Sequence, residues 1–161
     1  LINSSIEKIE IPCHVTQIQK FAFSNCNHLK KVEFTENSEL ETIEKYALAS
    51  SSIEKFNLPL NVKIIDEGAF DLCNSLNVFT VPEKSKLNVF DKYSFMKSSI
   101  NSIFIPQFAN KVEAFAECFN LKIIEISENL NIKEIDVTEY DELDLIIMVP
   151  SRLRSSFNFS E

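Results

Sequence analysis

Apolar residues recur along the chain in short segments that begin every 21 to 24 residues. Each segment has apolar residues at positions 1, 4 and 6, as in Ile6-Glu7-Lys8-Ile9-Glu10-Ile11. Six segments begin at Ile6, Leu29, Ile53, Leu76, Ile100 and Leu121. A degraded copy over residues 143–161 includes Ile147-Met148-Val149-Pro150. Apolar positions 4 and 6 alternate with polar ones, which predicts a strand with one buried face.

A second apolar run follows each segment. In the first copy it places apolar residues at Val15, Ile18, Ala22-Phe23 and Cys26, and in the third at Val62, Ile65, Ala69-Phe70 and Cys73. The Ala-Phe-x-x-Cys run suits a tight turn or a single helical turn that points Phe into a core.

A fixed period of about 23 residues predicts a solenoid, because one repeat cannot bury its apolar face unless neighbouring repeats stack on it. We expect an α/β solenoid of six to seven coils that forms a single domain over residues 1–161. Its parallel β-sheet would line the concave face, with short strands, turns or single helical turns on the convex side.

The repeat L-x-x-L-x-L-P-x-x-V-x-x-I-x-x-x-A-F-x-x-C resembles the BspA-like leucine-rich repeats of bacterial and protist surface proteins. The resemblance covers residues 6 to about 150. The family often carries Gly near the A-F turn, whereas this chain has a single glycine, Gly68. Cys becomes Ser51 and Ser98 in the second and fourth copies, the fifth copy is shortened, and the sixth has Glu139-Tyr140 in place of Ala-Phe. The resemblance implies a cell-surface or secreted location.

Composition narrows the possible partners. The formal net charge is −8 and the pI is about 4.9, which argues against nucleic acid and anionic membrane surfaces, since both need clustered Lys and Arg. No apolar run reaches the roughly 18 residues of a membrane span. The chain begins Leu1-Ile2-Asn3, so we expect it to be part of a longer protein.

No residue pattern points to catalysis, and we expect no enzyme, cofactor or metal site. The single glycine excludes a P-loop and a G-x-G-x-x-G motif. The pairs Cys13-His14 and Cys26-x-His28 match no zinc spacing, and Cys26 has a core register. Equivalent cysteines lie two coils apart, roughly 10 Å at the spacing of strands, so we expect Cys26, Cys73 and Cys118 to be buried and free. Sequons at Asn3 and Asn158 support secretion only weakly.

Positions 3 and 5 of each strand should point away from the core and form two columns. Position 3 reads Lys8, Lys31, Lys55, Val78, Ser102, Ile123 and Ile146. Position 5 reads Glu10, Glu33, Asn57, Thr80, Phe104, Glu125 and Met148. The first half predicts a solvated face that neutralises its own charge. In the second half the candidate contact residues are Val78, Phe104, Ile123, Ile146 and Met148, because exposed apolar patches usually mark contact sites.

The most economical function is a non-enzymatic interaction module that contacts a host, matrix or other cell-surface protein, or a second copy of the chain through its C-terminal half. One alternative is that the chain's own tail, with Phe157 and Phe159, covers the apolar patch. Two further alternatives are an intracellular scaffold, which unpaired cysteines would suit, and a regulatory repeat domain of a larger protein.

Overall fold

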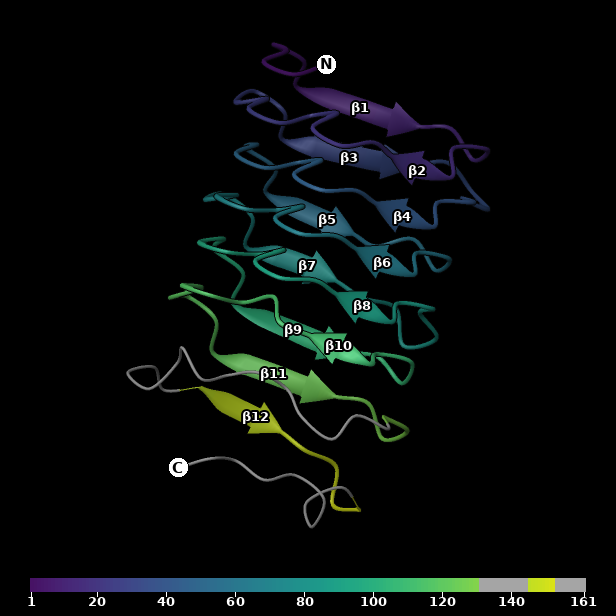
Figure 1. Ribbon diagram of the computed structural model, residues 1–161, viewed down its shortest axis with the longest axis vertical. Coiled ribbons are helices and arrows are strands. Elements are labelled where there is room, and N and C mark those ends of the chain that lie inside the picture. Colours follow the sequence, from purple (N-terminus) through teal and green to yellow (C-terminus); the bar gives the residue numbers. More distant parts are fainter. Residues whose placement is uncertain (131–144, 153–161) are drawn as a thin grey trace.

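A computed structural model describes residues 1–130 and 145–152 as a stack of β-coils (Figure 1). Each coil contributes one longer strand and, in the first five coils, one two-residue strand. The longer strands are β1 (Lys8–Ile11), β3 (Lys31–Phe34), β5 (Lys55–Asn57), β7 (Val78–Thr80), β9 (Ser102–Ile105), β11 (Ile123–Ile126) and β12 (Ile146–Met148). The short strands are β2 (Gln17–Ile18), β4 (Thr42–Ile43), β6 (Ile64–Ile65), β8 (Val89–Phe90) and β10 (Lys111–Val112).

Within each ladder, every strand pairs in parallel with its equivalent in the next coil. The longer strands form the ladders β1-β3-β5-β7 and β9-β11-β12, and the short strands form β2-β4-β6-β8-β10. Strand β9 lies beside β7 in the stack (Figure 1). Because the connections between coils have nearly constant length, equivalent residues stay in register, as the repeat predicted.

The expected helical turns, and with them the α/β class, are wrong: the described residues contain no helix, and the fold is a parallel β-solenoid. In the turn after β2, alternate amides bond within the turn, as Ala22 N–H does to the Gln19 carbonyl at 2.9 Å. The amides between them donate to the next coil, as Phe23 N–H does to the Ala47 carbonyl at 2.7 Å. An α-helix would use these donors internally, so stacking of the coils replaces the helix.

Phenylalanine fills the core along the stack. Phe23, Phe70, Phe95 and Phe115 are all buried, as the repeat register predicted. The Phe70 ring stacks on the Phe95 ring with centroids 5.1 Å apart, and it meets Phe56 and Phe79 edge to face at 4.9 and 5.2 Å. These are favourable aromatic geometries, so the turn residue Phe70 packs against strand residues of its own coil and of the next.

The four cysteines are free, and Cys26, Cys73 and Cys118 are buried, as predicted. The Cys73 thiol donates to the Leu48 carbonyl of the preceding coil at 3.2 Å, and Cys118 donates to the Phe95 carbonyl at 2.8 Å. In the intervening coils Ser51 and Ser98 take the cysteine position and lie against these sulfurs. The column therefore alternates thiol and hydroxyl, and no two cysteines occupy adjacent coils.

Gly68 is explained by a contact with the neighbouring coil rather than by its backbone angle alone. Its φ is +61°, but Phe21, Tyr46 and Tyr93 adopt the same left-handed conformation at the equivalent position. A Cβ on Gly68 would lie 2.1 Å from Cε1 of Tyr46. The Tyr46 ring is held there by a hydrogen bond from its hydroxyl to Glu67 at 3.1 Å, so this coil lacks a side chain where the previous coil supplies a ring.

Candidate interaction face

The outward side chains of β1, β3, β5, β7, β9, β11 and β12 form one continuous surface, here called the strand face. Its columns follow the register predicted from the repeat. Lys31 pairs with Lys8 and Lys55, Lys55 pairs with Val78, and Ile123 pairs with Ser102 and Ile146. In the second column Glu125 pairs with both Phe104 and Met148. The strand face therefore changes character along the stack as the sequence indicated.

The N-terminal half of the strand face is charged and internally paired. Glu33 forms ion pairs with Lys8 of the preceding coil, at 2.6 Å, and with Lys31 beside it. Hydrogen bonds from these two lysines lower the pKa of the Glu33 carboxyl. One carboxylate thus offsets two stacked lysines, which explains how like charges are tolerated in one column.

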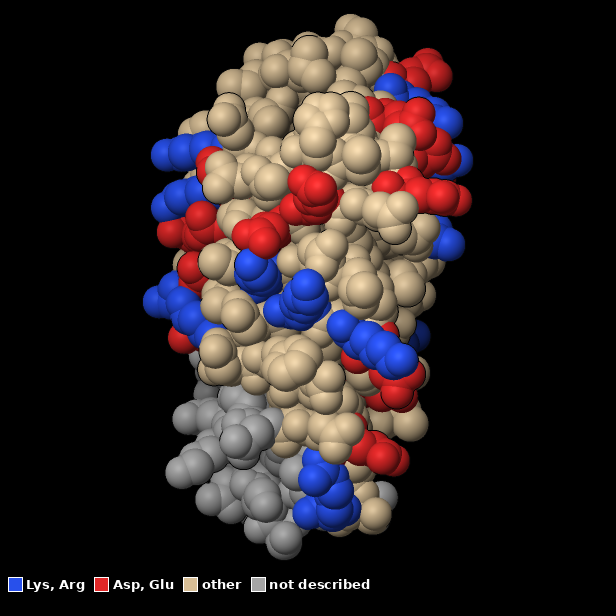
Figure 2. Space-filling model, turned by 90° about the vertical axis from the view of Figure 1, so that its right-hand side faces the viewer, with Lys and Arg blue, Asp and Glu red and all other residues tan. Residues whose placement is uncertain are grey.

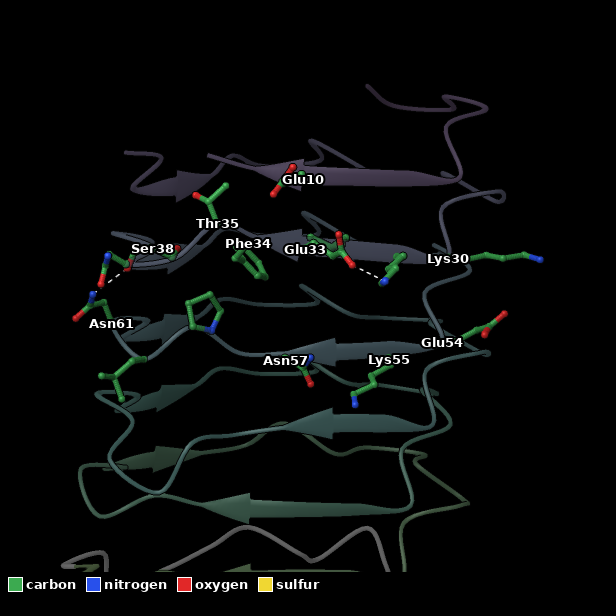
Figure 3. A pocket seen from close by; sticks show the side chains of 15 residues that line it. Glu10, Lys30, Glu33, Phe34, Thr35, Ser38, Glu54, Lys55, Asn57 and Asn61 are labelled. Carbon is green, nitrogen blue, oxygen red and sulfur yellow. Dashed lines mark hydrogen bonds and ion pairs between the residues drawn. The ribbon is translucent and has the colours of Figure 1, made fainter. Parts of the chain in front are cut away.

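An open hollow of about 1040 Å³ lies over this charged half (Figure 3). Glu10, Glu33, Lys55 and Asn57 line it from the strands, and Asn61 closes one end by donating to the Ser38 carbonyl at 2.9 Å. Most of the residues that line it are polar or charged. It is open to solvent, and among its charged residues Lys31 and Glu33 form an ion pair with each other.

The C-terminal half of the strand face is apolar, and the structure brings all five candidate residues onto it. Val78, Ile123, Ile146 and Met148 are exposed, by 40%, 37%, 59% and 52%, and Phe104 is half-buried against the core. Val78, Phe104 and Ile123 line a hollow of about 240 Å³. Met148 lines a second one, of about 660 Å³, with Ile147 and Pro150. Ile146 lies next to Ile123 in the ladder.

Sequence reasoning gave no role to Glu125, which lies in the middle of this patch and lines both hollows. The signal was available, because position 5 of the repeat reads Phe104, Glu125, Met148 in successive strands. Phe157 and Phe159, proposed as a possible cover for the patch, lie outside the described residues.

A second surface feature lies on the turns after the short strands. The rings of Phe21 and Tyr46 stack with centroids 5.6 Å apart. Lys20, Lys45 and Lys92 each lie over the aromatic ring of the following residue, at 5.0, 5.5 and 5.9 Å. The recurring Lys-aromatic dipeptide was visible in the sequence but was not singled out. The turns after β2, β4 and β8 therefore each carry a cation–π pair.

The side of the stack where the chain leaves the longer strands is seen face on in Figure 2. Uncharged residues cover much of it, and acidic and basic side chains intermix along both margins. Within the described residues no group of three or more His, Cys, Asp and Glu side chains could hold a metal ion. The same part of the chain contains no helix with the length and hydropathy of a membrane span.

Two solved structures are among those that resemble this chain. The pneumococcal vaccine antigen PcpA is 27% identical with a TM-score of 0.73, over 76% of this chain and 31% of that chain. A leucine-rich cell-surface protein from Faecalibacterium prausnitzii is 25% identical with a TM-score of 0.54, over 76% of this chain and 40% of that one. The chain thus spans less than half the length of either. A search of curated proteins found no match.

The family comparison agrees with the coil geometry. The model of the BspA type leucine-rich repeat region matches in six copies, over residues 2–114 and 87–151. These ranges contain the stacked strands, the buried Phe positions and the Cys/Ser column described above. The chain belongs to the BspA-type leucine-rich repeat family.

Proposed function

We propose that this chain is a non-enzymatic protein-interaction module whose contact surface is the C-terminal half of the strand face, centred on Phe104. One observation carries the proposal: along two in-register columns, Lys and Glu give way to Val78, Phe104, Ile123, Ile146 and Met148. Hydration of apolar surface costs about 25 cal/mol per Å², and solenoids commonly bind through an extended strand face. An aromatic anchor among aliphatic side chains also matches the make-up of interface hot spots.

The similar proteins support a location outside the cell. One is described as a cell-surface protein and another as a vaccine antigen. By that similarity, the partner is a host, matrix or other cell-surface protein. Three buried, free thiols instead favour an intracellular scaffold, because disulfides are rare in reducing compartments. Accessibility of the chain to an antibody on intact cells separates the two locations.

The contact surface is tested by selecting ligands from a phage-displayed random dodecapeptide library, with the 161-residue chain as bait. Phe104→Asp should abolish binding of the selected peptides and lower the melting temperature only modestly, because Phe104 is half-buried at the surface of the core rather than inside it. Asn57→Asp is the matched control. It adds the same charge in the same column on β5, outside the apolar half, and should bind like wild type.

Other results assign the patch to other occupants. If Phe104→Asp converts a dimer to a monomer in sedimentation, a second copy covers the patch. If Phe104→Asp lowers the melting temperature strongly, and deletion of residues 151–161 creates a dye-binding surface, the chain covers its own patch. Peptides that bind Phe104→Asp as well as wild type would contradict the proposed surface.

A further inference from the structure

We propose that the small hollow beside Phe104 accepts an arginine side chain from the partner, with Glu125 as its counter-ion. This inference rests on the proposed function, since it names the chemistry that the same surface recognises. The hollow has a volume of about 240 Å³ and is lined by Val78, Phe104, Ile123 and Glu125, among others. Because a water molecule occupies about 30 Å³ of liquid, this space suits one long side chain rather than a folded segment.

The lining combines the two groups that a guanidinium prefers. Phe104 on β9 and Glu125 on β11 are register partners in adjacent parallel strands, so their backbones lie about 4.8 Å apart. An aromatic face and a carboxylate at that spacing can stack on a guanidinium and accept its hydrogen bonds together. The hollow's edge adds polar acceptors at Asn101 and Ser102, where the Ser102 hydroxyl donates to Asn101 Oδ1 at 3.2 Å.

The charge of Glu125 is available to a partner. Glu33 occupies the same column position on β3, and two lysines neutralise it. Among the described residues, the ion pairs do not include Glu125. Its column neighbours are Phe104 and Met148 instead of cations. A carboxylate among apolar side chains is best satisfied by a cation with an apolar stem, because such a side chain buries its methylene groups along the patch.

The aliphatic residues around the hollow indicate that the residues next to the arginine in the partner are apolar. Ile123, Ile146 and Met148 continue the patch beyond the hollow on β11 and β12. In such a partner the guanidinium would contact Glu125, and the apolar residues that flank the arginine would pack on these aliphatic side chains. The chain's net charge of −8 further favours a basic partner during encounter.

A double-mutant cycle with one selected dodecapeptide tests the inference. Selected sequences should share an arginine beside apolar residues. Glu125→Gln should lower the affinity for such a peptide about tenfold, since it removes one partner of a charged pair. The same substitution should not change the affinity for a version of the peptide in which the arginine is replaced by glutamine. Glu10→Gln is the matched control, because it removes the same charge at the same register position on β1, and it should have little effect.

The outcomes separate this inference from the proposed function. If binding depends on Phe104 but Glu125→Gln has no effect, or weakens both peptide versions equally, the arginine site is wrong and the contact surface stands. If no selected peptide depends on Phe104, the contact surface itself is wrong. Restored binding between Glu125→Arg and an Arg→Glu peptide would place the two charges in direct contact. Melting temperatures of the variants verify that each protein is folded.

Discussion

The repeat assigns the same burial to equivalent residues in different coils. Phe70 makes ring contacts with Phe56, Phe79 and Phe95 and is fully buried. Phe70→Ala should lower the free energy of unfolding by about 3–5 kcal/mol, through lost burial and the cavity left behind. Urea unfolding followed by circular dichroism measures this difference. Phe119→Ala is the control, because Phe119 is 69% exposed, and a similar loss in that variant would contradict the assignment of the core.

The cysteines differ in exposure by coil position. Burial raises the pKa of the Cys73 and Cys118 thiols to about 11, so both stay protonated and unreactive at neutral pH. Cys13 is exposed. Under native conditions without reductant, a thiol reagent should modify Cys13 rapidly, and the other three only after denaturation. A disulfide between any two of Cys26, Cys73 and Cys118 would contradict the stacking, because they lie in alternate coils.

Strand pairing brings Lys8 of one coil to Glu33 of the next, beside Lys31. The hydrogen bonds from Lys31 and Lys8 lower the Glu33 pKa. A group with a depressed folded pKa stabilises the fold above its unfolded pKa, and that contribution is lost as pH falls through the folded value. We therefore expect NMR titration to give Glu33 a pKa below the ordinary value of a glutamate. Lys31→Gln should raise the Glu33 pKa towards its ordinary value, whereas Lys55→Gln, a change in the same column without an ion pair to Glu33, should shift it much less.

The turns show a second effect at the level of elements. Their spacing of Ala, Phe and Cys suits one helical turn as well as successive tight turns, so the sequence alone did not distinguish them. Pairing between coils selects the tight turns, because alternate amides such as those of Phe23 and Phe70 donate to the neighbouring coil. Left-handed residues such as Asn25, Ser50 and Leu72 at the turn ends complete this backbone path, and they include apolar residues that local preference would not select.

In the whole molecule, stability depends on neighbours along the stack. A central coil has hydrogen-bonded coils on both sides, whereas β1 pairs only with β3. In solenoids each repeat is stabilised by its interfaces. Hydrogen exchange should therefore be at least about tenfold slower for the amides of Phe56 and Phe70 than for those of Ile9 and Ile18. A tenfold difference in exchange rate corresponds to only about 1.4 kcal/mol of extra local stability. Equal protection along the stack would show that the coils unfold as one unit.

The sequence by itself determined the repeat, the register of the strands, the buried Phe and Cys positions and the change of character along the strand face. These features follow from apolar spacing, since one residue of slip would turn the buried side chains outward. The five candidate residues could be placed on one face for the same reason. Glu125 belongs to the same column, but the sequence does not distinguish it from Glu33. The structure does, because Glu33 has two lysine partners and Glu125 has no ion pair among the described residues.

Only the tertiary structure decided how the turns are built, why Gly68 is a glycine and where the surface is hollow. Each of these depends on contacts between coils: the amide bonds from one turn to the next, the Tyr46 ring over Gly68, and the gap between Phe104 and its neighbours on adjacent strands. A repeat pattern states which residues are equivalent, and it does not state which atoms of two coils meet. That information arises when the coils stack, because packing and hydrogen bonding across the coil interface select one backbone path among several that suit the same local sequence.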